Sequence, residues 1–293
     1  MQRLLLILFL IFPVICAAEP TQLQRDLART YIIWQKAMAG KDFRSWSGIM
    51  AKDRQIEVKN RILSEKFRYP QSIFNIPVTP PSVRNLKMLS AKAKGNNAKA
   101  VFFGKVNFEV GGQPEDNLLI VSYLREEGLW KFVKADYVNL TFQKDVRKQI
   151  LDKNYDFLNA PDFQPEPYTR KNLIVLQKPV DYITKVYAYC PGREVRVVYN
   201  ERSNHLFQNE QEAEVAIGGA IAGKNQIKMA IKSLPGSEKI EPIAVRVYIF
   251  SQIKGVNPVK AYEYLVQEGG KVDGIVSTTF EITPEMINTI LGK

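Results

Sequence analysis

Apolar residues recur at every third or fourth position near the start of the chain, which predicts a helix. The stripe consists of Leu23, Leu27, Tyr31, Trp34 and Met38. Thr21 followed by Gln24 is a capping-box pattern that begins such a helix. Gly40 is expected to end it as a left-handed cap. Two shorter helices are expected next, the first capped by Asp42.

The period of the pattern changes to two after the prolines of residues 70–81. Residues 98–110 alternate apolar with polar side chains and predict a long half-buried strand. Similar runs at 86–94, 118–125 and 129–140 flank it across short turns. The pattern therefore predicts an antiparallel meander of four strands that follows the helices. One more helix is expected at residues 144–158.

Two short motifs in this region resemble the nuclear transport factor 2-like superfamily. They are Gly40-Lys41-Asp42 after the first helix and Gly128-Leu129-Trp130-Lys131-Phe132 at the last strand. The resemblance covers residues 21–140. It implies a cone-shaped α+β domain whose helices cover a bent sheet and leave a pocket. Members include ketosteroid isomerases and dehydratases, and also non-catalytic binding and dimerising modules.

Prolines 161, 165 and 167 predict an extended linker at residues 159–169, between domains at 19–158 and 170–293. The second domain has the short alternating runs of a β-sandwich. Its expected strands are residues 182–189, 194–199, 212–217, 227–231, 243–250, 261–266 and 275–281. Thr283 and Pro284 begin a closing helix. The expected fold class is α+β: N-terminal helices packed on a curved antiparallel sheet, followed by a C-terminal all-β sandwich.

Residues 1–18 are typical of a secretory signal peptide. Arg3 precedes an apolar run from residue 4 to residue 15, and Cys16-Ala17-Ala18 offers small residues for cleavage. The run is shorter than the roughly 20 residues of a membrane span. A lipoprotein signal at Cys16 is the alternative, and bulky Ile15 disfavours it. We expect an exported protein, periplasmic or extracellular, with no transmembrane span after cleavage and Cys190 as its single thiol.

The formal net charge is +11, and most of the excess lies before residue 166. Residues 66–108 contain eight Lys or Arg and no Asp or Glu. The lysines expected to form a binding surface are Lys87, Lys92, Lys94, Lys99 and Lys105. A basic field of this kind favours an acidic partner. We expect an envelope protein or an anionic polymer, because export disfavours nucleic acid; a merely solvated face is the alternative. The pattern specifies no oligomeric state.

Catalysis in the first domain would need a general acid and base. The candidates are Asp136, Asp42 and Tyr123. The domain contains no histidine, which is common in catalytic members of the superfamily, so a non-enzymatic binding or assembly factor is favoured. A small-molecule isomerase or dehydratase in the first-domain pocket is the alternative.

Carbohydrate binding on the sandwich is a further alternative. The residues that could stack on a sugar are Tyr182, Tyr187, Tyr189, Tyr199, Tyr248, Tyr262 and Tyr264. No cofactor or metal is expected, because the chain has one histidine, His205, expected in a loop, and two cysteines.

Residues 218–225 come within one residue of a phosphate-binding loop, with Asn225 in place of Ser or Thr. A Gly-rich hairpin between two strands is the favoured interpretation. That hairpin would pair Glu212 and Glu214 with Lys228 and Lys232.

Overall fold

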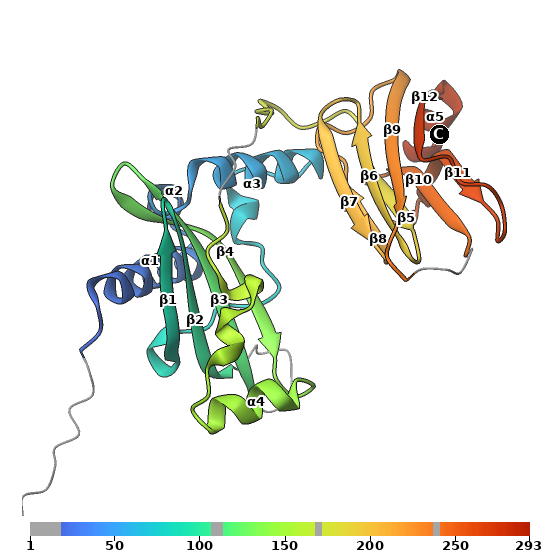
Figure 1. Cartoon of the computed structure of the whole chain (residues 1–293). Coiled ribbons are helices and arrows are strands. Elements are labelled where there is room, and N and C mark those ends of the chain that lie inside the picture. The colour runs from blue at the N-terminus through green and yellow to red at the C-terminus, as the bar shows by residue number, and fades with distance from the viewer. Residues whose placement is uncertain (1–18, 107–113, 168–171, 237–240) are drawn as a thin grey trace, which may run out of the picture.

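The computed structural model describes residues 19–106, 114–167, 172–236 and 241–293 (Figure 1). The chain is α+β, with helices first and three antiparallel four-stranded sheets after them, as expected from the sequence. In these described ranges no helix is long and apolar enough to cross a bilayer. The expected signal peptide and the end of the expected 98–110 strand lie outside the described residues.

Helix α1 (Gln22–Ala39) begins with the predicted capping box at Thr21 and Gln24. Its end differs from the prediction. Gly40 is right-handed, with φ −84°, and Lys41 takes the left-handed conformation at φ 52°. The N–H groups of Lys41 and Asp42 bond back to the carbonyls of Met38 and Ala37. These two bonds close a Schellman motif, which places the left-handed residue one position after Gly40.

Two further helices and two short 3₁₀ turns complete the helical region. The helices are α2 (Phe43–Ile49) and α3 (Lys52–Ser64), and the turns are Gln71–Phe74 and Val83–Asn85. Asp42 caps α2 as predicted, because its carboxylate accepts the N–H of Ser45 at 3.1 Å.

The predicted meander is confirmed. Its strands are β1 (Lys87–Lys94), β2 (Asn97–Val106), β3 (Glu115–Glu126) and β4 (Leu129–Asn139), paired in the order β1-β2-β3-β4. Neighbouring residues of a strand point to opposite faces. Helices α1 and α2 cover one face, where they bury Leu27, Tyr31 and Trp46 with Ala98, Ala100 and Phe102 of β2. The opposite face carries Lys99, Val101 and Phe103 of the same strand.

The helix expected at 144–158 is shorter in the structure. Helix α4 (Lys144–Leu151) ends where Lys153 becomes left-handed and Asn154 bonds back to the Gln149 carbonyl. Two 3₁₀ turns follow at Asp156–Asn159 and Pro161–Phe163. Residues 155–167, named the strap from here on, pack on the sheet with α4, where they bury Leu158 against Val101 and Leu118. The first nine residues of the expected extended linker are therefore part of a packed unit.

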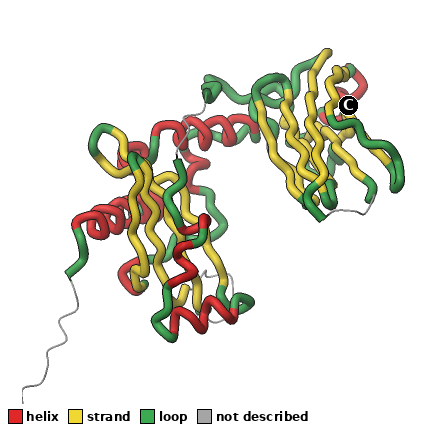
Figure 2. The backbone as a smooth tube through the Cα atoms, in the orientation of Figure 1, coloured by secondary structure: helices red, strands yellow, loops and turns green. Residues whose placement is uncertain are grey.

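The remaining chain forms two sheets with the orders β11-β10-β5-β8 and β12-β9-β6-β7. The strands are β5 (Ile183–Tyr189), β6 (Arg193–Tyr199), β7 (Ser203–Gln208), β8 (Gln211–Val215), β9 (Gly223–Ser233), β10 (Ile243–Phe250), β11 (Val259–Val266) and β12 (Ile275–Ile282). Helix α5 (Pro284–Ile290) closes the chain, capped by Thr283 as predicted. Figure 2 shows helices α1–α4 grouped beside the first sheet and the later strands grouped in the other two sheets.

Both of these sheets contribute to one buried apolar cluster, so they face each other. The cluster includes Val186 and Val245 from one sheet and Val197, Phe207 and Ile227 from the other. Strand β7 was not predicted, because two of its three buried residues, Ser203 and His205, are polar. The expectation that His205 lies in a loop is therefore wrong.

The hairpin interpretation of residues 218–225 is also wrong. Strands β8 and β9 belong to different sheets, so the Gly-rich segment crosses from one sheet to the other. The expected cross-strand pairs are consequently not those of the structure. Glu214 bonds to His205, and Lys228 pairs with Glu201 at 3.1 Å.

The sheet of β1–β4 and the pair of sheets built from β5–β12 meet at the C-terminal end of α3 (Figure 1). The buried amide of Asn60 donates to the Ile174 carbonyl at 2.5 Å and accepts the Leu176 N–H at 2.9 Å. Ser64, also buried, accepts the Gly218 N–H at 3.0 Å. The contact therefore depends on buried polar groups whose hydrogen bonds are satisfied.

Candidate functional site

The helix-covered face of the first sheet is filled by aromatic side chains. The rings of Trp34 and Phe132 stack at 4.0 Å, and Tyr31 lies within 6.4 Å of Phe102. Tyr123, a catalytic candidate, is 2% exposed, and its hydroxyl has no hydrogen-bond partner among the described residues. Burial raises the pKa of Tyr123 well above its usual value, so the phenol stays protonated at neutral pH.

The other two catalytic candidates lie elsewhere. Asp42 is the α2 cap, and its hydrogen bonds with Ser45 lower the pKa of its carboxyl. Asp136 lies on the opposite face of the sheet from Tyr123, exposed, with its carboxylate 2.9 Å from the ammonium of Lys134. The structure therefore does not bring Asp42, Asp136 and Tyr123 together in one site.

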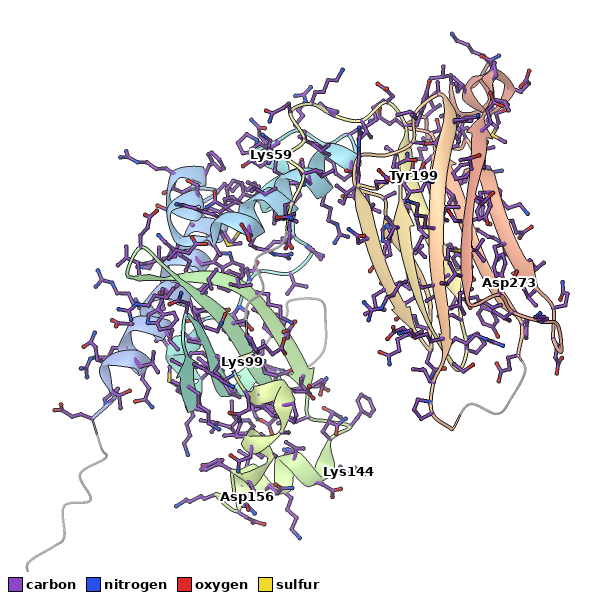
Figure 3. All side chains as sticks on the ribbon, turned by 45° about the horizontal axis from the view of Figure 1, so that its top comes forward. Lys59, Lys99, Lys144, Asp156, Tyr199 and Asp273 are labelled. Carbon is purple, nitrogen blue, oxygen red and sulfur yellow. The ribbon has the colours of Figure 1, made fainter. Side chains whose placement is uncertain are left out.

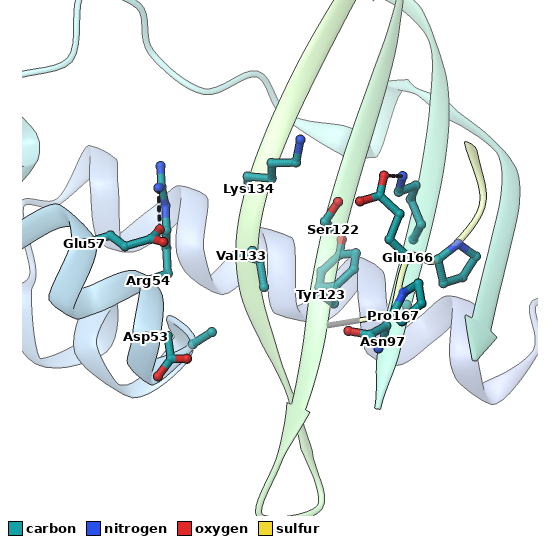
Figure 4. A pocket seen from close by; sticks show the side chains of 14 residues that line it. Asp53, Arg54, Glu57, Asn97, Ser122, Tyr123, Val133, Lys134, Glu166 and Pro167 are labelled. Atoms are coloured by element: carbon teal, nitrogen blue, oxygen red, sulfur yellow. Dashed lines mark hydrogen bonds and ion pairs between the residues drawn. The ribbon is translucent and has the colours of Figure 1, made fainter. Parts of the chain in front are cut away.

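The hollow part of the first sheet is on the face away from α1 and α2. Two cavities of about 490 and 380 Å³ lie there, and both are lined by Lys99, Lys134 and Glu166. We name them together the groove. The first cavity lies between α3 and the end of the strap, and the second between β4, α4 and the strap. Figure 4 shows the first cavity, with Ser122 at its floor and Glu166 on the strap side.

Two of the expected binding lysines, Lys99 and Lys92, hold the strap on this face. Lys99, only 7% exposed, donates to the Asp162 carbonyl at 2.7 Å and lies 3.7 Å from the Glu166 carboxylate. Lys92, paired directly with Lys99 in the sheet, donates to the Leu158 carbonyl at 3.3 Å. Figure 3 shows Lys99 on the sheet beside the strap. The ammonium group of Lys99 therefore contacts the strap rather than an open surface.

The remaining expected lysines lie further out. Lys87 donates to the Tyr155 hydroxyl at 2.9 Å and lies 5.4 Å from that ring. Lys94 and Lys105 are exposed and lie toward opposite ends of the sheet, because Lys94 pairs with Asn97 whereas Lys105 pairs with Asp116. The structure thus brings Lys92 and Lys99 together beneath the strap and leaves Lys94 and Lys105 apart.

The groove has mixed charge. Its cations are Arg54, Lys99 and Lys134, and its carboxylates are Asp53, Glu57, Asp136, Asp162 and Glu166. Arg54 pairs with Glu57 at 2.8 Å. Such a surface offers donors and acceptors side by side, which suits a ligand that carries both. A polyanion would meet more carboxylates than cations there.

The Gly-rich segment that resembles a phosphate loop encloses a side chain instead. The Oδ1 atom of buried Asn225 accepts the Ile221 N–H at 3.1 Å and the Tyr199 hydroxyl at 3.0 Å. Its Nδ2 atom donates to the Ile221 and Gly223 carbonyls at 2.8 and 2.9 Å. Asn225 therefore takes the place inside the turn where a phosphate would need free backbone N–H groups.

Sequence reasoning missed a chain of hydrogen bonds around the single histidine. Ser203 Oγ lies 2.9 Å from His205 Nε2, and His205 Nδ1 lies 2.6 Å from the Glu214 carboxylate. This is the order of groups in a serine-hydrolase triad. Ser203 is only 1% exposed and already accepts the Ile217 N–H at 2.8 Å, so a substrate has no access to Oγ in this conformation.

Across the described ranges, no group of three or more His, Cys, Asp or Glu side chains could hold a metal ion. Cys190 is buried, and burial raises the pKa of its thiol. No known protein family, curated protein or solved structure matches the chain.

Proposed function

We propose that the chain is an exported, non-enzymatic binding or assembly factor of the cell envelope, and that its groove holds an extended segment of a partner protein. The strap is the observation that carries this proposal. Residues 164–167 form no helix or strand, and they already lie along the groove as an extended Pro-containing segment. The groove therefore accommodates polypeptide of the kind we assign to the partner.

The contacts of the strap indicate how a second segment would be bound. Lys99 and Lys92 donate to main-chain carbonyls of the strap, so recognition there depends on backbone rather than on a particular side chain. Lys134 lies on the opposite wall, exposed and paired with Asp136, where it can contact the partner's carbonyls. Ser122 at the floor adds a hydroxyl that can donate or accept.

The division of the chain into two domains, the first nuclear transport factor 2-like and the second a β-sandwich, is part of the same proposal. Three buried apolar clusters support it. Two lie between residues 27 and 158, the third lies between residues 186 and 290, and none shares a residue with another. Export remains proposed from residues 1–18 alone.

The enzymatic alternative gains no support from the geometry, because its three candidate residues are separated and Tyr123 is buried. The carbohydrate alternative is weakened in part. Tyr199 is buried, and Tyr182, Tyr262 and Tyr264 pack against the cluster between the two sheets.

Photocrosslinking tests the proposed groove. A photoreactive amino acid replaces Ser122 in the full chain, which is produced in the organism that encodes it. A control variant carries the same amino acid at Thr279, an exposed position on β12. We expect a protein adduct of discrete mass from the Ser122 position that Thr279 does not give. Ser122→Trp, which fills the groove, should abolish binding of the partner so captured. Adducts at both positions, or at neither, would contradict the proposal.

A further inference from the structure

The two sheets after residue 182 differ on their outward faces. In β10 the inward residues are Val245, Val247 and Ile249, so Ala244, Arg246, Tyr248 and Phe250 point outward. Outward residues of β5 and β11 continue this surface, which we name the aromatic face. Its members are Ile183, Lys185, Tyr187, Tyr189, Ala244, Arg246, Tyr248, Phe250, Lys260, Glu263 and Leu265.

Cations and rings alternate on the aromatic face. Arg246 pairs with Tyr187 across the sheet, and its guanidinium lies 5.6 Å from that ring. Lys185 pairs with Tyr248, and its ammonium lies 5.3 Å from the Phe250 ring. These contacts order the long side chains before any partner arrives, which lowers the entropic cost of binding. They also cover the Tyr187 and Phe250 rings, which a sugar would otherwise stack on.

The aromatic face carries more cations than carboxylates. Glu263 is the only carboxylate among its named members, and it forms ion pairs with Arg246 at 2.5 Å and Lys260 at 2.6 Å. Lys185 lies over a ring instead. A surface with excess positive charge fits an acidic partner. Tyr, Phe and Arg are also the residues enriched in protein interfaces, whereas a purely solvated face carries few rings.

The outward face of the other sheet has the opposite character. Its residues on β9 and β12 are Lys224, Gln226, Lys228, Ser277, Thr279 and Glu281, with Ala230 and Ile275 at one end. Two of its cations are paired with neighbouring carboxylates, Lys228 with Glu201 at 3.1 Å and Arg196 of β6 with Glu194 at 2.9 Å. This face therefore provides a matched control with one Arg and one Lys.

We propose that the aromatic face is a docking surface for an acidic protein segment that carries aromatic or apolar side chains. The partner's carboxylates contact Lys185 and Arg246, and its apolar groups pack on Tyr248, Tyr189 and Leu265, which is 43% exposed. This surface is separate from the groove, so each proposal can fail while the other holds.

Binding to a random copolymer of glutamate and tyrosine tests the docking surface, with the full chain lacking residues 1–18. We expect the parent to bind, and Lys185→Gln/Arg246→Gln to weaken binding at least tenfold. Tyr187→Ser/Tyr248→Ser removes rings without changing charge and should also weaken it. The control Arg196→Gln/Lys228→Gln should stay within twofold of the parent. Thermal unfolding verifies that each variant is folded.

Three results would overturn the docking proposal. The parent could fail to bind the copolymer. The control could lose as much affinity as Lys185→Gln/Arg246→Gln, in which case only net charge matters. Polygalacturonate, an acidic glycan without rings, could bind more tightly than the copolymer and show the same losses, in which case the face binds an anionic polymer and not a protein.

Discussion

Lys99 in the first sheet and Lys185 in the third quarter of the chain have similar sequence surroundings but different environments. Each lies on a strand in which its neighbours along the chain are buried and point to the opposite face. Lys99 is covered by the strap and donates to a main-chain carbonyl. Lys185 is half-buried and lies over the Phe250 ring on the outward face of its sheet. The contrast indicates that a strand lysine is accessible to a partner only where no later segment of the chain covers it.

Lys99 is covered because the strap packs over it, and the strap lies far away in the sequence. The strap carries the carbonyls of Leu158 and Asp162, which are more than 60 residues from Lys92 and Lys99. Each such bond is long-range, so local pattern cannot reveal it. The two sets of cations should therefore differ in what they contribute to stability and to binding.

The largest effect is expected at Lys99. Lys99→Met removes a buried donor and leaves the Asp162 carbonyl without its partner, so the free energy of unfolding should fall by about 2 kcal/mol. Denaturant unfolding followed by Trp fluorescence measures this change. Lys94→Met, at the exposed end of the preceding strand, should change it by less than about 0.5 kcal/mol. Equal losses for the two variants would show that the strap bond has no special weight.

A smaller loss is expected from Arg246→Met on the aromatic face. The variant removes a cation–ring contact and an ion pair with Glu263, both partly exposed, so about 1 kcal/mol should be lost. The same unfolding measurement applies. A loss larger than that of Lys99→Met would reverse the comparison, because it would make Arg246 a structural residue rather than a binding one.

Glu166→Gln should have a still smaller effect. The Glu166 side chain is 79% exposed and lies 3.7 Å from Lys99, so solvent screens the pair and less than about 1 kcal/mol should be lost. This variant separates the two partners of Lys99 in the same unfolding experiment. If Glu166→Gln equals Lys99→Met, the carboxylate and not the Asp162 carbonyl holds the lysine.

The smallest effect concerns pH. Hydrogen bonds from Lys260 and Arg246 lower the pKa of Glu263. A carboxyl with a lowered folded-state pKa adds stability above its unfolded pKa and loses it as pH falls through the folded pKa. The melting temperature of the parent should therefore exceed that of Glu263→Gln at neutral pH, and the gap should close in acid. A gap that persists unchanged in strong acid would contradict this assignment.

The sequence pattern was sufficient where hydropathy and hydrogen bonding agree. The Leu27–Tyr31 stripe, the Asp42 cap and the four-strand meander all follow from local periodicity and are present. Strand β7 was hidden because Ser203 and His205 are buried polar residues that bond to each other. Hydropathy gives no signal for a polar residue whose burial depends on a partner.

The candidate site was less predictable than the fold. Residues 159–167 of the strap were expected to belong to an extended linker, since their prolines indicate extended chain, whereas the apolar residues Leu158 and Phe163 pack the strap on the sheet. The groove exists because of that packing. The aromatic face was present in the pattern only as scattered tyrosines, and the sheet order was needed to separate Tyr187 and Tyr248 from buried Tyr199.

We infer that the uncovered cations of the aromatic face, and not the lysines of the first sheet, contact an acidic partner. The decisive comparison is the affinity for the glutamate–tyrosine copolymer of Lys185→Gln/Arg246→Gln and of Lys94→Gln/Lys105→Gln, since both pairs remove two charges. We predict at least a tenfold loss for the first pair and less than a twofold change for the second. A larger loss for Lys94→Gln/Lys105→Gln would contradict the claim and return the binding surface to the first sheet.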